Sequence, residues 1–164
     1  MAREATPFIA SIDVDDPVFS SMGDMPRKIE QQCKASGQSI PNSKNETIRT
    51  ALEGLALKYR QVLENLRSQT GKSLEKIHIV GGGTKNELLN QMTADSTGCE
   101  IISGPIEATS VGNILVQMIA TGDISSLAEG RQLVRESFEP KRYQPHHSDQ
   151  WEDAYQTMRS LNQA

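Results

Sequence analysis

The sequence has 164 residues, a formal net charge of −4 and an aromatic content of 4%. This length is typical of one domain with a real core, and an acidic balance without a basic stripe argues against nucleic-acid binding. No apolar run approaches the ~20 residues that span a bilayer, and residues 1–10 lack the apolar segment of a secretory signal. The two cysteines have no metal-like spacing and are interpreted as reduced thiols. We therefore expect a cytoplasmic protein without a membrane or nucleic-acid partner.

Residues 1–42 are predicted to form an extended segment followed by a short helix. The first part contains prolines, a glycine and three aspartates between Asp13 and Asp16, and no period persists in it. The spacing of these aspartates is not that of a calcium-binding loop, so we interpret them as a solvated acidic turn. Asp24, followed by Met25 and Pro26, predicts a helix start, and Gly37 predicts its end.

Residues 43–139 are predicted to form an α/β nucleotide-binding core. Ser43-x-x-Glu46 is a capping box, and apolar residues recur at helical spacing from Ile48 to Leu66, so a long helix is expected to end near Gly71. Further helices are expected from a second capping box, Thr84-x-x-Glu87, to Gly98, from Glu107 to Thr121, and from Ser125 or Ser126 to about Phe138. Residues 140–164 are predicted to be an irregular stretch to His147 and a last helix, Asp149 to Leu161. The three parts are expected to make one partial domain.

Two short strands are predicted within this core. Residues 77–80 are rich in β-branched side chains and read as a buried strand, and residues 100–103 form a second strand. Strands that alternate with helices favour an α/β fold with parallel strands. Two strands do not make a viable parallel sheet, so we expect the other strands to lie outside this chain. The uncovered sheet edge also offers a template for a homo-oligomer.

Three consecutive glycines, Gly81, Gly82 and Gly83, follow the first predicted strand. Glycine loses more backbone freedom on folding than any other residue, so such a run needs a reason. One reason is a phosphate or nucleotide that lies against the backbone at the end of a strand; the other is a tight turn that requires positive φ. Neither the dinucleotide fingerprint, whose last glycine would be Asn86, nor the Walker A pattern fits.

The stretches HIVGGGTKNELLNQMTADSTG and GPIEATSVGNILVQMIA resemble the C-terminal part of the FGGY family of carbohydrate kinases. The resemblance implies an actin-like (ribonuclease H-like) ATPase lobe with few parallel strands and many helices. It also implies that ATP with Mg²⁺ is the cofactor of the intact enzyme, bound at Gly81, Gly82, Gly83 and Asn86. In this reading the nucleotide lies against Gly82, where a Cβ would collide with it, and Asn86 lies by the adenine.

No catalytic residue and no metal ligand is predicted in this chain. The family's catalytic aspartate, its first phosphate loop and its sugar contacts are expected upstream of Met1. His78, His146 and His147 form no closed zinc ligand set, and His78 is read as a half-buried strand histidine.

The segments DPVF, GDMP and GNILVQ resemble the family members that phosphorylate L-rhamnulose at its 1-hydroxyl. This implies ATP or ADP as a ligand of the chain, L-rhamnulose as a ligand of the missing part, and no activity from the 164 residues alone. Two alternatives stay open: a kinase for another ketose, such as xylulose or fuculose, and a non-catalytic nucleotide-binding or scaffold module.

Overall fold

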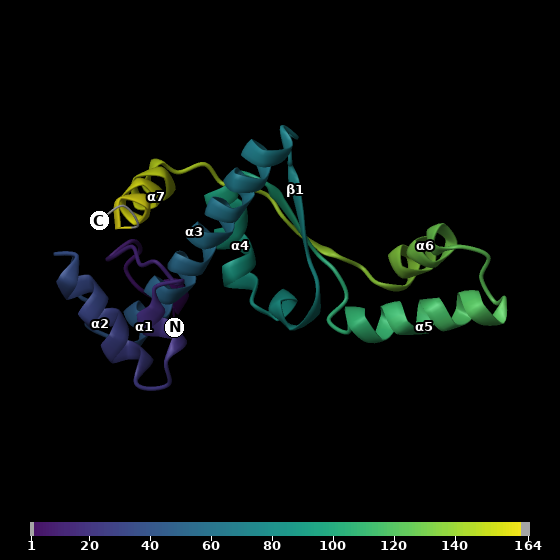
Figure 1. Ribbon diagram of the computed structural model, residues 1–164, viewed down its shortest axis with the longest axis horizontal. Coiled ribbons are helices and arrows are strands. Elements are labelled where there is room, and N and C mark those ends of the chain that lie inside the picture. The colour runs from purple at the N-terminus through teal and green to yellow at the C-terminus, as the bar shows by residue number, and fades with distance from the viewer. Residues whose placement is uncertain (1, 162–164) are drawn as a thin grey trace.

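A computed structural model describes residues 2–161 of the chain. Helices predominate, and three short strands form one sheet (Figure 1). With η for a 3-10 helix, the elements are η1 (Ala2–Glu4), α1 (Pro17–Ser20), α2 (Met25–Ala35), α3 (Lys44–Thr70), β1 (Lys76–Ile79), η2 (Gly81–Lys85), α4 (Glu87–Thr97), β2 (Glu100–Ser103), α5 (Ala108–Thr121), α6 (Leu127–Ser137), β3 (Lys141–Tyr143) and α7 (Asp149–Leu161). Within these residues, no helix combines the length and the apolar character needed to cross a membrane.

The long helix α3 is central to the packed body. Its start is fixed by Ser43, whose hydroxyl accepts a hydrogen bond from the N–H of Glu46 at 3.2 Å. The Glu46 carboxylate in turn accepts one from the N–H of Asn42 at 2.7 Å. The predicted capping box is therefore present, but its second bond reaches Asn42 and not Ser43. The helix ends where Gly71 adopts a φ of +64°, as the glycine predicts.

Apolar packing holds the other helices and the N-terminal segment against α3. Leu57 of α3, Met92 of α4 and Met158 of α7 belong to one buried cluster. Phe8 packs on it and meets Trp151 edge-on, with the ring centroids 4.8 Å apart. A second cluster joins the N-terminal segment to α2 and contains Ala10, Ile12, Ile29 and Cys33. Figure 1 shows α5 and α6 projecting from this body as an arm, while both chain ends lie on the opposite side.

The sheet has the order β1-β2-β3 and mixes two strand directions. β1 and β2 run parallel, with Ile77 opposite Ile101, and β3 pairs antiparallel to β2, with Tyr143 opposite Ile101. The parallel pair confirms the expected strand direction. The prediction that residues 140–147 are irregular is wrong for Lys141–Tyr143. Three residues are too few to show a strand pattern in the sequence. Lys141–Tyr143 is a strand because it pairs with β2.

Two further predictions need correction. Residues 77–80 are not a buried strand: β1 is an edge strand on which exposed and half-buried residues alternate, so His78 and Val80 are exposed. The segment before α2 is not wholly extended, since residues 2–24 contain η1 and α1. Asp16 caps α1 by accepting a hydrogen bond from the N–H of Val18 at 2.8 Å. The division of the chain at residues 42 and 139 stays a prediction.

Candidate functional site

The glycine run lies in the connection between β1 and α4, at the carboxyl end of the strand. Gly81 has a φ of +80°, and its N–H donates to the carbonyl of Pro105 at 3.1 Å. The N–H of Gly104 donates to the carbonyl of Ile79 at 2.7 Å. These two bonds tie the connection after β2 to the connection after β1. The connections that follow β1 and β2 therefore form one continuous backbone surface at the carboxyl ends of the two strands.

The three glycines differ in what the fold itself requires. Gly81 is required by its positive φ, which L residues rarely adopt. Gly83 has no positive φ, and an added Cβ would make an ordinary contact at 3.7 Å with Ile79. Gly82 also has no positive φ, and an added Cβ would meet no atom within 4 Å. The turn explanation therefore accounts for Gly81, whereas nothing within the described chain requires a glycine at position 82.

The glycine run does not lead directly into the α-helix, contrary to the simplest form of the prediction. The 3-10 helix η2 intervenes, and its Thr84 hydroxyl donates back to the carbonyl of Gly81 at 2.7 Å. Thr84 therefore closes η2 and does not cap α4, so the predicted capping box Thr84-x-x-Glu87 is wrong. Glu87, in the first turn of α4, pairs instead with Lys141, and this partner lowers the pKa of the Glu87 carboxyl.

Asn86 is the N-cap of α4. Its Oδ1 accepts a hydrogen bond from the N–H of Leu89 at 3.1 Å, and the residue is exposed beside the glycine run. Asparagine is among the best N-cap residues because its oxygen satisfies an otherwise unpaired N–H. Capping alone is therefore a sufficient structural reason for Asn86. The cap uses only Oδ1, so the amide Nδ2 of Asn86 can donate a hydrogen bond to an acceptor atom on a ligand.

Asn90 supports η2 through a buried hydrogen bond. The sequence pattern does not predict this role. It is only 1% exposed, and its Nδ2 donates to the carbonyl of Thr84 at 3.1 Å. A buried amide needs such a partner because its desolvation is otherwise uncompensated. The available signal is an asparagine on the face of α4 that also carries buried Thr93 and Ala94.

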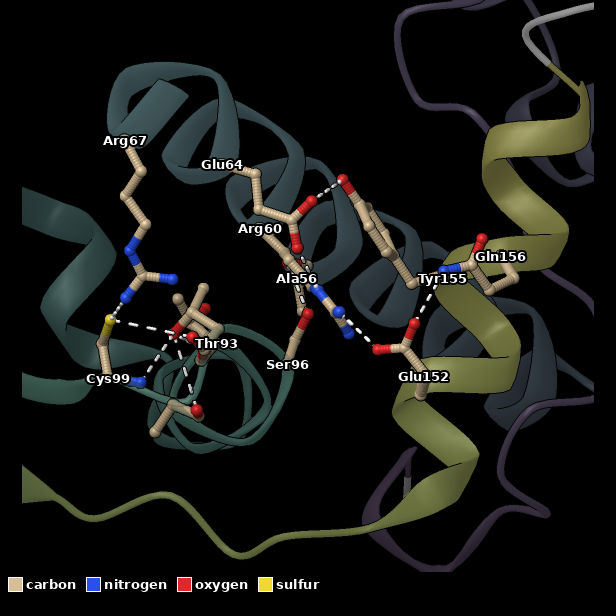
Figure 2. A network of polar contacts seen from close by, with 12 residues as sticks. Ala56, Arg60, Glu64, Arg67, Thr93, Ser96, Cys99, Glu152, Tyr155 and Gln156 are labelled. Carbon is tan, nitrogen blue, oxygen red and sulfur yellow. Dashed lines mark hydrogen bonds and ion pairs between the residues drawn. The ribbon is translucent and has the colours of Figure 1, made fainter. Parts of the chain in front are cut away.

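A second polar network lies between α3, α4 and α7 (Figure 2). Arg60 donates to Glu64 at 2.9 Å and to Glu152 at 2.5 Å, and its guanidinium lies 4.1 Å from the centroid of the Tyr155 ring. The Tyr155 hydroxyl donates to Glu64 at 2.8 Å. Burial, followed by the Glu64 carboxylate, raises the pKa of Tyr155 to about 12. These groups satisfy one another, so we assign the network to fixing α7 on α3.

The histidines and carboxylates do not converge on a metal site. Among residues 2–161, no group of three or more His, Cys, Asp or Glu side chains is arranged to hold a metal ion. His146 pairs with Asp95 at 3.3 Å, whereas His78 is exposed on β1 and not half-buried as predicted.

A comparison with models of protein families shows to which family the chain belongs. The model of the C-terminal domain of the FGGY family of carbohydrate kinases matches residues 1–121. The chain belongs to the FGGY family. The predicted resemblance is thereby confirmed, and the matched region contains β1, η2, α4, β2 and α5.

The curated relatives of this FGGY chain include several rhamnulokinases. It is 40% identical to rhamnulokinase from Bacteroides thetaiotaomicron over 94% of its own length and 32% of that protein. It is 38% identical to rhamnulokinase from Bacillus subtilis over 88% of its length and 30% of that protein. The chain therefore spans about a third of the length of these relatives.

Solved structures of FGGY kinases share the fold. Xylulose kinase from Rhodospirillum rubrum matches 77% of this chain and 26% of its own, with a TM-score of 0.60 and 19% identity. Plasmodium falciparum glycerol kinase, solved with ADP, matches 74% of this chain and 24% of its own, with a TM-score of 0.58 and 22% identity. The predicted fold class is confirmed: this is a helix-rich part of the sugar-kinase fold with a small sheet.

Proposed function

We propose that this chain is the ATP-binding C-terminal part of a carbohydrate kinase. The intact enzyme would transfer the γ-phosphoryl group of ATP to the 1-hydroxyl of L-rhamnulose, in the cytoplasm. Relatives named rhamnulokinase at 34–40% identity support this sugar. The solved kinases of glycerol and xylulose are 22% and 19% identical and support only the fold.

The observation that carries the nucleotide site is the open space at Gly82. A glycine with an ordinary φ and no neighbour within 4 Å of its missing Cβ gains nothing from the fold, yet it loses conformational entropy on folding. A ligand that lies against the backbone at this point supplies the reason. The position agrees with the general rule that ligands of α/β sheets bind beyond the carboxyl ends of the strands.

Each residue of the proposed site has a distinct role. Gly81 makes the turn, and its N–H is already used by Pro105. Gly82 and Gly83 admit the phosphates or ribose of the nucleotide. Asn86 donates its Nδ2 to the adenine while its Oδ1 continues to cap α4.

Among residues 2–161, no group of three or more His, Cys, Asp or Glu side chains could hold a metal ion, and we place the catalytic base outside this range. When bound to the intact enzyme, Mg²⁺ would neutralise charge on the phosphates of ATP, with its protein ligands outside residues 2–161. We therefore assign nucleotide binding and orientation to this chain, and expect it to produce no ADP from ATP and L-rhamnulose alone.

A titration of the isotope-labelled chain with ATP tests the site. We expect the backbone amide resonances of residues 81–86 to shift and saturate in wild type, and Gly82→Val to remove this response. Gly112→Ala is the matched control, because Gly112 also has an ordinary φ and open space around its missing Cβ. Resonances at 81–86 that stay unmoved in wild type, or a Gly82→Val chain that responds like wild type, would refute the proposed site.

A further inference from the structure

The ion pair between Lys141 and Glu87 lies at the same end of the sheet as the candidate nucleotide site. Lys141 is the first residue of β3 and stands opposite Ser103, the last residue of β2. Because β3 runs antiparallel to β2, its start lies at the carboxyl ends of the two parallel strands. The connections after β1 and β2, which Gly81 and Gly104 tie together, are therefore followed along this edge by the start of β3.

An open cavity of about 580 Å³ lies beside this ion pair. It is lined by Glu87 of α4 and by residues 139–143. Its volume falls in the ~300–1,000 Å³ range of small-molecule sites. Glu87 directly follows Asn86, the residue proposed to lie by the adenine. The cavity therefore adjoins the candidate nucleotide site.

The Glu87 carboxylate is held in place but keeps a free oxygen. Among residues 2–161, Lys141 is the one hydrogen-bond partner of the Glu87 side chain, and it contacts Oε1. An ionised carboxylate accepts on both oxygens, so Oε2 remains available as an acceptor. The Glu87 side chain is 50% exposed and lines the cavity, so its carboxylate is accessible to a ligand there.

The ion pair keeps both of its groups charged at neutral pH. The hydrogen bond from Lys141 lowers the pKa of Glu87, and the same bond raises the pKa of Lys141. Glu87 is therefore a charged acceptor that donates no hydrogen bond. Such a group favours an N–H or O–H donor on a ligand and disfavours an acceptor in the same place.

The order of residues along the site indicates which part of the nucleotide faces Glu87. In the proposed function, the phosphates or ribose lie at Gly82 and Gly83, and the adenine lies by Asn86. The cavity lies at β3, at the other end of the strand order from β1 and its glycine run. The edge of adenine remote from the ribose carries the exocyclic amino group, an N–H donor. This edge therefore faces the cavity that Glu87 lines.

We propose that Glu87 selects adenine as the base of the nucleotide by accepting a hydrogen bond from its amino group. This inference rests on the proposed function as the ATP-binding part of a kinase, and it extends the same site to β3. Lys141, which lies beyond the residues 1–121 that match the family model, is a positioning residue that orients the Glu87 carboxylate. A base with a carbonyl oxygen in place of the amino group would set two acceptors against each other.

Titrations of the isotope-labelled 164-residue chain with ATP and with inosine triphosphate test this role. Inosine triphosphate carries a carbonyl oxygen where ATP carries the amino group. We expect the amide resonances of residues 81–86 to respond to both, with ATP bound about tenfold more tightly by wild type. Those of residues 139–143 should shift with ATP.

Glu87→Gln tests the selecting residue, because its amide can donate to the carbonyl oxygen as well as accept from the amino group. It should reduce the preference for ATP to about twofold or less. Glu30→Gln is the matched control, because Glu30 is also an exposed carboxylate on a helix and is paired with a lysine, Lys34. This control should keep the wild-type preference.

Lys141→Met tests the positioning role, because it leaves the Glu87 carboxylate in place without its partner. We expect this change to lower the preference for ATP by about two- to fivefold, and Lys141→Arg to restore it. Circular dichroism of Glu87→Gln and Lys141→Met should match wild type, since both side chains are at least half exposed. A preference that Lys141→Met leaves unchanged would show that Lys141 does not orient the carboxylate.

Three results would overturn the inference: equal binding of both nucleotides by wild type, a preference that Glu87→Gln keeps, or resonances at residues 139–143 that ATP leaves unmoved. In each case the response of residues 81–86 to ATP still reports on the proposed function, which can hold while base selection by Glu87 fails. A wild-type chain without any response at residues 81–86 would instead refute the nucleotide site itself, and base selection with it.

Discussion

Asn86 offers a direct test of the candidate site because its two side-chain atoms are given separate tasks. Its Oδ1 accepts from the N–H of Leu89 at 3.1 Å and caps α4, while its Nδ2 is proposed to donate to adenine. Asn86→Asp keeps an oxygen for the cap, since aspartate caps as well as asparagine, but it removes the donor. Asn86→Ala removes both.

The expected magnitudes follow from these bonds. Loss of the cap in Asn86→Ala should lower the free energy of unfolding by about 1 kcal/mol, which lowers the melting temperature by about 2–4 °C in a chain of this size. Asn86→Asp should melt close to wild type. A single hydrogen bond to a ligand contributes roughly 0.5–1.5 kcal/mol, so both variants should bind ATP about two- to tenfold more weakly.

Thermal unfolding followed by circular dichroism measures the first effect, and titration of the labelled chain with ATP measures the second. An Asn86→Asp chain that binds ATP as tightly as wild type would reduce Asn86 to a helix cap. An Asn86→Ala chain with an unchanged melting temperature would contradict the capping argument itself.

Two further predictions concern buried polar groups. Asn90→Leu leaves the Thr84 carbonyl unpaired, so we expect a loss of about 1–3 kcal/mol in stability and faster hydrogen exchange at residues 81–85; unchanged exchange there would show that Asn90 does not support the turn. Burial raises the pKa of Glu53, against the opposing effect of Arg49. The folded chain therefore binds the Glu53 proton more tightly than the unfolded chain, and the contribution of Glu53 to stability falls as pH rises above its unfolded pKa. The free energy of unfolding in urea can be compared between wild type and Glu53→Gln at pH 4 and at pH 7. Relative to the variant, wild type should be less stable at pH 7 than at pH 4. A difference that stays constant, or that favours wild type more as pH rises, would be inconsistent with this assignment.

Local signals in the sequence located most helices because helix ends are set by nearby residues. Ser43 with Glu46 fixed the start of α3, and Gly98, with a φ of +68°, marks the end of α4 as predicted. The strand of residues 100–103 was also found, since its apolar run lies between a glycine and a Gly-Pro pair.

The errors concern features that depend on distant partners. β3 exists because Lys141–Tyr143 pairs with β2, which a three-residue pattern does not reveal. β1 was predicted to be buried from its composition, but burial depends on which neighbours are present. The pattern Thr84-x-x-Glu87 predicts a capping box, but Asn86 is also a competent N-cap. The 3-10 turn, which Thr84 closes and Asn90 on α4 supports, decides between them.

At the candidate site, the glycine run itself does not distinguish its members, and only the family resemblance singles out Gly82 as the residue beside the nucleotide. A run of three glycines carries no information on which one needs positive φ and which one needs space. The backbone of Gly81 and the open surroundings of Gly82 separate these two reasons. The binding roles of Gly81, Gly82, Gly83 and Asn86 stay predictions until the ATP titration is made.

The contact between Phe8 and Trp151 has a consequence for how the chain folds. It joins the first residues of the sequence to the last helix, and the N–H of Phe8 is held at the same time by the buried Glu53 carboxylate at 3.1 Å. Contacts between remote parts of a chain require the closure of a long loop and slow the folding rate. On a ribosome, α3 and α4 would emerge before α7, so the apolar faces that pack against α7 would stay uncovered until residues 149–161 have been made. The time in which these faces can aggregate or bind a chaperone is therefore set by the synthesis of α7.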